Sequence, residues 1–313
     1  MRAVVIREFG PPRVLEPAEV AEPVPGQDDV VIEVELANVT FVETQVRAGR
    51  PPHPSMLPAL PAILGNGVGG TVAGTGRRVV ASLNGTGGYA ERAAVPAARL
   101  IEIPDGVAMR DAVALLADGR TALSLAARAE LRAGDTVLVE AAAGGVGTLL
   151  VQLARNAGAR VVALAGQPRK LALARDLGAD LTVNYRQDDW AEQVRTAVGH
   201  VDVVFDGVGG EVGLAAFGLL GPKGRYCPFG MASGSFAPVT AELAEARQVS
   251  VRRGAPASAG ELLALAREAL AEAAAGRIRP VIGQESHLAE AAAAHAAIEA
   301  RETMGKTLLT VPH

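Results

Sequence analysis

Apolar and polar positions alternate in short runs through roughly the first hundred residues, and proline and glycine clusters separate these runs. Such alternation is typical of short strands and tight turns, so this part predicts a partly open barrel or sandwich. The strands that we expect are Ala3–Arg7, Val30–Leu36, Thr71–Val72, Arg78–Leu83 and Glu91–Val95. The stretch from Pro51 to Pro61 predicts a loop, because proline breaks a helix.

From about Asp111 the pattern changes, and strand-like apolar runs alternate with stretches that have apolar residues at helical spacing. The expected strands are Thr136–Glu140, Arg160–Ala165, Leu181–Asn184, Asp202–Asp206 and Arg225–Phe229. The expected helices are Gly147–Ala157, Arg169–Leu177, Asp188–Val198 and Leu214–Leu220. This alternation predicts βαβ units, which build a parallel sheet with helices on both faces.

The last sixty residues have a looser pattern. The elements that we expect are a helix at Ala259–Ala274, a strand near Arg279–Ile282, a helix at His287–Arg301 and a strand at Lys306–Val311. We expect this tail to fold back onto the N-terminal part of the chain.

Composition narrows the class of protein. A chain of 313 residues with 49% hydrophobic and 20% charged residues can build two cored domains and is not disordered. The net charge of -4 is spread among interspersed acids and bases, and aromatic residues make up 3%, so we expect no nucleic-acid partner. One cysteine, Cys227, and the absence of a long apolar run predict a cytoplasmic protein without a membrane span.

The strongest motif is a glycine-rich turn at residues 141–147, Ala-Ala-Ala-Gly-Gly-Val-Gly, between a predicted strand and a predicted helix. Glycines here let the chain turn tightly and let backbone amides approach a diphosphate at the helix N-terminus. Ala141 stands where the common fingerprint has its first glycine. In this strand–turn–helix context the motif predicts a dinucleotide cofactor.

The end of the next strand indicates which dinucleotide binds. An NAD enzyme places a carboxylate there for the ribose hydroxyls, but residues 165–170 read Ala-Gly-Gln-Pro-Arg-Lys. Arg169 and Lys170 would attract a 2′-phosphate. The alternative is that both cations are simply solvated, although a helix start disfavours cations. We therefore expect NADPH rather than NADH.

With these motifs, the chain resembles the medium-chain dehydrogenase/reductase superfamily, and within it the zinc-independent, zeta-crystallin-like quinone oxidoreductase branch. The resemblance covers nearly the whole length. Its marks are residues 41–44 with 47–49, 87–91, 119–122, 141–147, 177–180 with 184–185, 204–210 and 305–306.

The resemblance implies an α/β fold: a GroES-like, partly open β-barrel catalytic domain and a doubly wound Rossmann cofactor domain. Its boundaries would be residues 1–118 and 254–313 for the catalytic domain, and 119–253 for the NADPH-binding domain. It also implies a homodimer that pairs the edge strands of two Rossmann sheets, at Arg225–Phe229 or a neighbouring segment.

The same resemblance implies a set of cofactor-binding residues. Residues 143–147 would hold the diphosphate, Gly166, Lys170 and Tyr185 would surround the 2′-phosphate, and residues 229–231 would border the nicotinamide. The full expected set is Phe41, Thr121, Ala143, Gly144, Gly145, Val146, Gly147, Gly166, Arg169, Lys170, Tyr185, Val208, Phe229, Gly230 and Met231.

We expect no catalytic metal. Catalytic zinc needs three protein ligands, but Cys227 falls in a predicted strand and the histidines lack ligand spacing. The histidines are His53, His200, His287, His295 and His313.

The reaction that we expect is hydride transfer from NADPH to a quinone or other α,β-unsaturated carbonyl bound in the interdomain cleft. Thr40 is the candidate donor to the developing oxyanion, and its alternative role is that of an ordinary strand-end threonine. Relatives often carry asparagine at Thr40 and an acid at Gly67, which leaves the substrate open.

Two alternatives remain at this stage. An enoyl-thioester reductase would need basic residues at a channel mouth, for which Arg47, Arg50, Arg77 and Arg78 are available. A non-catalytic NADPH-binding sensor or scaffold would bind the cofactor without turnover.

Overall fold

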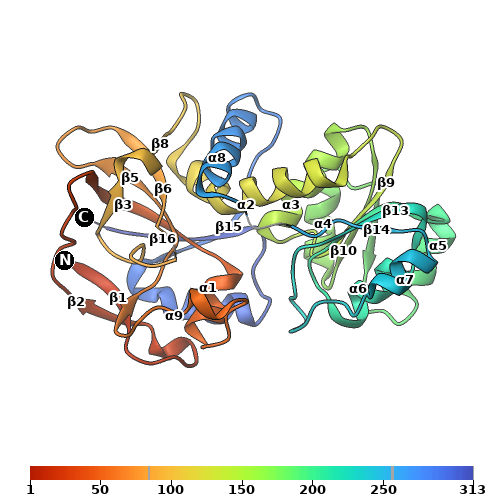
Figure 1. The fold of residues 1–313 in the computed structure, drawn as a ribbon, viewed down its shortest axis with the longest axis horizontal. Coiled ribbons are helices and arrows are strands. Elements are labelled where there is room, and N and C mark those ends of the chain that lie inside the picture. Colours follow the sequence, from red (N-terminus) through yellow and green to blue (C-terminus); the bar gives the residue numbers. More distant parts are fainter. Residues whose placement is uncertain (84, 255–256, 313) are drawn as a thin grey trace. The chain divides into compact units, whose positions relative to one another are not determined.

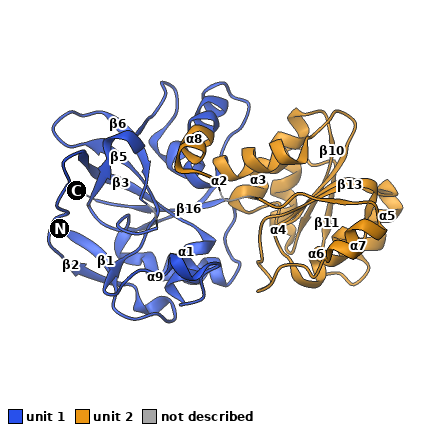
Figure 2. Ribbon diagram, viewed as in Figure 1, with its two compact units in different colours: residues 1–119, 266–313 blue, residues 120–265 orange. Residues whose placement is uncertain are grey.

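The fold is taken from a computed structural model, which describes residues 1–83, 85–254 and 257–312 (Figure 1). Contacts group the chain into two compact units (Figure 2). Unit 1 consists of residues 1–119 and 266–313, and unit 2 of residues 120–265. Helices α2 (Met109–Ala129) and α8 (Ala259–Ala274) contain the points where the chain passes from one unit to the other.

Unit 1 is built on two sheets. A three-stranded sheet has the order β2-β1-β4, and a seven-stranded sheet has the order β15-β16-β3-β5-β6-β8, with β7 paired to β3. The strands are β1 (Arg2–Ile6), β2 (Glu16–Glu19), β3 (Asp29–Val39), β4 (Ala62–Ile63), β5 (Gly67–Val72), β6 (Arg78–Ser82), β7 (Arg92–Pro96), β8 (Ile101–Glu102), β15 (Ile282–His287) and β16 (Lys306–Thr310). Alternate residues of β3, such as Ile32 and Val34, are fully buried in the core between these elements.

The C-terminal tail belongs to unit 1. β16 pairs antiparallel with β3, Leu309 opposite Ala37, and its Leu308 and Leu309 are fully buried. Helices α1 (Phe41–Arg47) and α9 (Ala291–Glu299) contact each other in the same unit. The expected fold-back of the tail onto the N-terminal part is confirmed.

Unit 2 contains one parallel sheet with the order β11-β10-β9-β12-β13-β14. Its strands are β9 (Thr136–Val139), β10 (Arg160–Ala165), β11 (Leu181–Asn184), β12 (Val201–Asp206), β13 (Leu220–Pro228) and β14 (Ser250–Val251). Its helices are α3 (Gly145–Asn156), α4 (Pro168–Asp176), α5 (Trp190–Val198), α6 (Gly210–Phe217) and α7 (Ala241–Ala246). The strand order reverses between β9 and β12, as in a doubly wound sheet. The expected α/β class, with a Rossmann sheet and a second antiparallel domain, is confirmed.

Several element predictions were wrong in their bounds. The strand expected at Arg225–Phe229, for example, is β13 and begins five residues earlier, at Leu220. The strand near Arg279–Ile282 is instead β15, which begins at Ile282 and has only half-buried and exposed side chains, so apolar residues do not mark it. The helix at Leu214–Leu220 is instead α6, which begins four residues earlier at Gly210, while Leu220 starts β13. The last helix begins at Ala291, after a short 3-10 turn at Leu288–Glu290.

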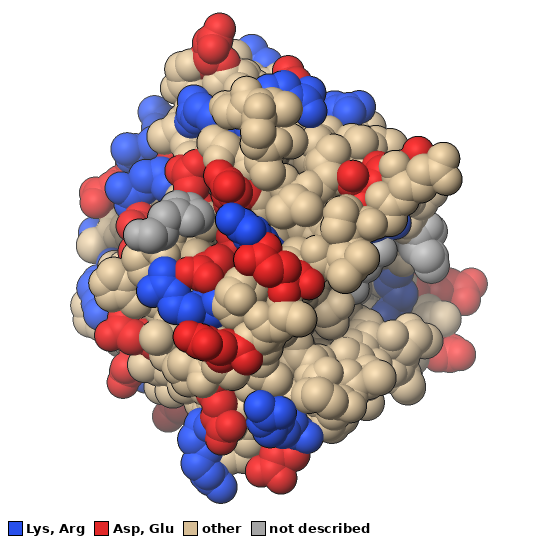
Figure 3. Space-filling model, turned by 90° about the vertical axis from the view of Figure 1, so that its left-hand side faces the viewer, with Lys and Arg blue, Asp and Glu red and all other residues tan. Residues whose placement is uncertain are grey.

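Two features of the molecule bear on its partners. Among the described residues, no helix has both the length and the apolar character that crossing a bilayer requires. On the face drawn in Figure 3, acidic and basic side chains lie interspersed and no single sign of charge dominates. This surface matches the charge pattern read from the sequence.

Candidate cofactor and active site

The glycine-rich turn joins β9 to α3 in unit 2. Gly144 is the N-cap of α3, and because it has no side chain, the first turn of the helix has no side-chain cap. A Cβ on Gly147 would lie 2.2 Å from the carbonyl oxygen of Ala141, so only glycine permits this approach of helix to strand. Ala143 is buried beside them. The backbone therefore forms the open, positively polarised helix start to which diphosphates bind.

Ala141 itself adopts a left-handed conformation with φ of 47°. Its carbonyl oxygen accepts from the amide of Gly144 at 2.8 Å, which closes the turn. Left-handed backbone is strained for a residue with a Cβ and is normally taken by glycine. The alanine that departs from the common fingerprint thus occupies the position where glycine matters conformationally.

The end of β10 faces the start of the loop after β11. A Cβ on Gly166 would lie 2.8 Å from Nε of Arg186 and 3.2 Å from Oη of Tyr185. Gln167 caps α4, whose first turn carries Arg169 and Lys170. Tyr185 and Gly166 are therefore neighbours, and Arg186 joins them. Sequence reasoning missed Arg186, although its place directly after Tyr185 could have indicated it.

The loops that follow β12 and β13 pack against each other. A Cβ on Gly207 would lie 2.7 Å from the ring of Phe229, and one on Gly230 would lie 2.5 Å from the carbonyl oxygen of Gly207. Val208, which follows Gly207, is buried. Met231 follows and is half-buried. The structure thus brings Val208, Phe229 and Gly230 together at the carboxyl end of the sheet.

A buried group of acids underlies these loops. The amide of Val208 donates to Oε2 of Glu140 and to Oδ1 of Asp206, both at 3.0 Å, and the amide of Gly209 donates to Oδ1 of Asp206 at 2.6 Å. The Tyr226 hydroxyl donates to Oδ2 of Asp206. Burial and the neighbouring Asp206 carboxylate raise the pKa of Glu140 well above its usual range. Sequence reasoning missed all three side chains, because only the tertiary fold brings them together.

Thr40 is the N-cap of α1 in unit 1. Its hydroxyl oxygen accepts from the amide of Glu43 at 3.2 Å, and its own amide donates to Oε2 of Glu43 at 2.5 Å, which together form a capping box. The hydroxyl also donates to Oε2 of Glu43 at 3.0 Å. Glu43 also accepts from the amide of Asn66 at 2.6 Å. The hydroxyl hydrogen of Thr40 is therefore directed at Glu43, and donation to another oxygen requires this hydrogen to rotate away from Oε2. Phe41, the first residue of α1, is 36% exposed.

Glu43 lies at one end of a buried polar chain in unit 1. The Tyr89 hydroxyl donates to Oε2 of Glu43 at 3.3 Å and lies 2.9 Å from Nε2 of His295. Burial lowers the pKa of His295 to about 3, with a smaller contribution from Arg47, so the imidazole is neutral at physiological pH. Through Tyr89, these contacts connect Glu43 of α1 with His295 of α9.

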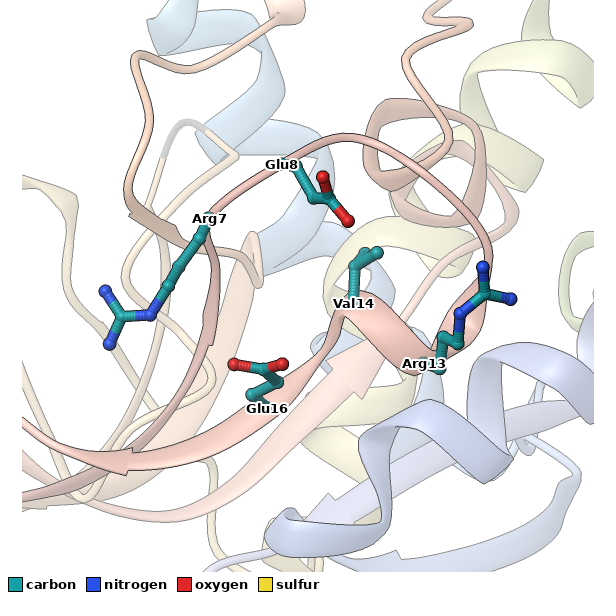
Figure 4. A pocket seen from close by; sticks show the side chains of 5 residues that line it. All are labelled: Arg7, Glu8, Arg13, Val14 and Glu16. Carbon is teal, nitrogen blue, oxygen red and sulfur yellow. The ribbon is translucent and has the colours of Figure 1, made fainter.

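Three further observations concern the remaining candidates. Thr121 lies in α2 and is half-buried. Among the residues that the structure describes, no three His, Cys, Asp or Glu side chains lie close enough together to hold a metal ion. A surface pocket of about 250 Å³ in unit 1 is lined by Arg7, Glu8, Arg13, Val14 and Glu16 (Figure 4). It contains none of the expected site residues.

Comparison with known proteins gives consistent relatives. A family model described as zinc-binding dehydrogenase matches residues 145–267. The chain is 33% identical to a quinone oxidoreductase of Pseudomonas aeruginosa, over 96% of this chain and 97% of that protein. It is 32% identical to a 2-haloacrylate reductase of a Burkholderia species, over 99% of this chain and 98% of that protein. The solved structure of Escherichia coli quinone oxidoreductase complexed with NADPH matches with a TM-score of 0.90 and 27% identity, covering 99% of this chain and 100% of that chain.

The doubly wound sheet, the glycine turn and these relatives define an oxidoreductase. The chain belongs to the medium-chain dehydrogenase/reductase superfamily, in its quinone oxidoreductase branch. The family expected from the sequence motifs is therefore confirmed.

Proposed function

We propose that this chain is an NADPH-dependent reductase that transfers hydride to a quinone or another α,β-unsaturated carbonyl without a catalytic zinc. The observation that carries the proposal is the end of β10, where Gly166 faces Tyr185 and Arg186 and no carboxylate occupies residues 165–170. Relatives support the same conclusion, since one is a quinone oxidoreductase and another a 2-haloacrylate reductase, and both names denote conjugated, electron-poor acceptors.

The residues present fit a dinucleotide phosphate. The uncapped start of α3 and the close approach at Gly147 leave backbone amides for the diphosphate. A side chain at Gly166 would collide with Arg186, which keeps the end of β10 open beside cationic groups. We propose that Arg169, Lys170 and Arg186, with the Tyr185 hydroxyl, bind the 2′-phosphate.

NADPH, when bound, supplies the hydride, and the protein supplies position and electrostatics. In our proposal Gly144, Gly145, Val146 and Gly147 orient the diphosphate, and Val208, Phe229, Gly230 and Met231 flank the nicotinamide end. This second assignment follows from their place at the carboxyl ends of β12, which borders the reversal of the strand order, and of its neighbour β13. Ala143, Phe41 and Thr121 are proposed from family resemblance.

Without a metal, a hydrogen-bond donor must stabilise the oxyanion that develops on the acceptor. Thr40 remains our candidate, on the condition that its hydroxyl turns from Glu43 toward the acceptor. The hydroxyl would then give up its hydrogen bond to Oε2 of Glu43, while Oγ1 continues to accept from the amide of Glu43. An acceptor that takes its proton from water requires no further acid from the chain.

The enoyl-thioester alternative loses one of its four proposed basic residues. Arg47 is 1% exposed and pairs with Glu299, so it does not receive a phosphate from solvent. Arg50, Arg77 and Arg78 are exposed, and Arg77 pairs with Glu102 at 2.9 Å. We further propose a cytoplasmic homodimer for this chain, on the basis of the lone buried Cys227 and the family resemblance.

The test is a comparison of cofactor binding and acceptor-dependent oxidation in wild type, Lys170→Glu and Arg160→Glu. Arg160 is exposed and lies at the opposite end of β10, so it is a matched control for the change in charge. Lys170→Glu should weaken NADPH binding about 10- to 100-fold, the value of one charge-assisted hydrogen bond, and leave NADH binding unchanged.

The control variant should bind both dinucleotides as wild type does, and turnover with quinones should survive chelators. Preference of the wild type for NADH would overturn the cofactor assignment. NADPH binding without oxidation by any quinone or enone would favour the sensor or scaffold alternative.

A further inference from the structure

The carboxyl groups of Glu140 and Asp206 meet at a single amide. Val208 N donates to both, at 3.0 Å each, and both side chains are fully buried. Glu140 directly follows β9 and Asp206 ends β12, the two strands between which the sheet order reverses. This reversal is the place where open α/β sheets bind their ligands. Two acids therefore lie beneath the proposed nicotinamide end of the site.

We propose that Glu140 and Asp206 hold one proton between them, and that this shared proton is what positions the Gly207–Gly209 loop for the nicotinamide. The inference rests on the proposed function for its cofactor, but the proton itself belongs to the apoprotein. Glu140 and Asp206 are positioning residues, since they act through the loop and not on the acceptor.

The hydrogen bonds indicate which acid carries the charge. Asp206 accepts from Val208 N, Gly209 N and the Tyr226 hydroxyl, and three donors stabilise a carboxylate. Glu140 has two backbone donors, Val208 N and Gly207 N, and it contacts Asp206, while its Oε1 is buried without a hydrogen-bond partner. A second buried negative charge in this contact would be costly, whereas a protonated Glu140 donates to Asp206. Burial and the Asp206 charge raise the pKa of Glu140 accordingly.

The groups that face the pair leave this assignment intact. Tyr226 of β13 is the titratable neighbour, and burial and Asp206 raise its pKa so that it stays a donor. α6 contributes Gly213, which has no charge and whose Cβ would lie 2.4 Å from Oδ2 of Asp206. Arg253 is the nearby cation, and its charge lowers the pKa of Tyr226 slightly against these larger effects.

Loss of the shared proton should disturb the loop. Two carboxylates would repel each other across the one amide of Val208, in a site with no room for added side chains at Gly207 or Gly209. The loop also packs on Phe229, so the displacement reaches the residues proposed to flank the nicotinamide. NADPH affinity should therefore fall as the pH rises through the ionisation of Glu140.

The test uses wild type, Glu140→Gln and the control Glu211→Gln, an exposed acid in the first turn of α6. Glutamine donates to Asp206 at every pH. Near neutral pH, wild type and Glu140→Gln should have equal dissociation constants for NADPH. Above the pH at which Glu140 ionises, the wild-type constant should rise relative to that of Glu140→Gln by about tenfold per pH unit. The control should follow wild type, which removes the titration of the 2′-phosphate from the comparison.

A second measurement does not need the cofactor. Infrared spectra of the apoprotein should contain the carbonyl stretch of a buried protonated carboxylic acid at neutral pH, and Glu140→Gln should lack it. Absence of this band from wild type, or a constant ratio of NADPH affinities across pH, would overturn the inference. If NADPH binds neither protein, the proposed function fails, while the infrared band still decides the shared proton.

Discussion

Ala141 has a strained backbone conformation at the cofactor turn. It holds φ of 47° with a Cβ present, while its carbonyl leaves no space for a Cβ on Gly147. The strain of a left-handed alanine is about 1–2 kcal/mol. The chain tolerates it because the turn is fixed from both sides, by the Gly144 amide and by the amide of Ala142, which donates to Leu164 O at 3.0 Å.

Ala141→Gly should therefore preserve or raise stability. Relief of the strain offsets the added flexibility of glycine in the unfolded chain, about 0.5–1 kcal/mol, so we expect a gain of about 0–1 kcal/mol in the free energy of unfolding. The matched control is Ala142→Gly, which changes a fully buried residue with ordinary φ and should destabilise by about 1 kcal/mol. Chemical unfolding of both variants measures the difference, and a larger loss for Ala141→Gly than for the control would contradict the assignment of strain.

Residue patterns predicted the glycine turn, because glycine is required there by local geometry that repeats from protein to protein. They could not predict Arg186 beside Gly166, or Glu140 beside Asp206. Glu140 and Asp206 are 66 positions apart, and their meeting depends on the pairing of β9 with β12. The assignments of Thr40 and of the cofactor-binding set stay predictions until binding is measured.

At the scale of elements, a neutral histidine of α9, His295, packs against the rest of unit 1. His295 is fully buried against Tyr89, with ring planes at 89° and centroids 5.8 Å apart, and the nearby Arg47 also disfavours its charged form. The unfolded chain takes up a proton at a pKa of 6.5, whereas the folded chain resists protonation until about pH 3. Stability contributed by this group is thus present above pH 6.5 and lost as the pH falls toward 3.

His295→Gln should reduce the loss of unfolding free energy as the pH falls from 6.5 toward 3. The wild type should lose about 1.4 kcal/mol of unfolding free energy per pH unit within that window from this one group, and the variant should not. Urea unfolding at a series of acidic pH values measures the slopes, and exposed His200→Gln is the control. Equal slopes in His295→Gln and wild type would show that folding does not lower the pKa of His295.

Element prediction succeeded where the apolar period is strong and failed where other forces set the boundary. β10 and β11 match the sequence expectation to the residue, because their apolar runs are bounded by glycine and charge. α6 starts at Gly210, where φ is 55°, and a glycine pair at a helix start has no helical signature. β15 is held by its pairing with β16, and its own side chains do not reveal it.

For the molecule as a whole, the return of the tail to unit 1 agrees with the family resemblance rather than with any local pattern. Pairing of β16 with β3 joins residues more than 260 positions apart, which no local pattern encodes. The domain boundaries at 118/119 and 253/254 stay predictions. The assembly of two chains also stays a proposal, and the edge of the unit 2 sheet offers its test.

β14 is the last strand in the sheet order and pairs with β13 through Ser250 and Val251. The amide of Arg252 donates to Tyr226 O, so alternation along the strand directs the N–H and C=O of Val251 away from β13. An edge of this kind is either covered or paired, and two copies joined through it would form a symmetric interface.

Val251→Pro removes the outward amide and leaves the inward hydrogen bond of Arg252 in place, so it should weaken a dimer formed through β14 without unfolding the sheet. Val251→Ala keeps the amide and is the matched control. Light scattering over a dilution series should find dimers in wild type and Val251→Ala. The dimer dissociation constant of Val251→Pro should be at least about tenfold larger, because the substitution removes one to two backbone hydrogen bonds from the interface. A monomeric wild type would refute the homodimer, and an undiminished Val251→Pro dimer would locate the interface away from this edge.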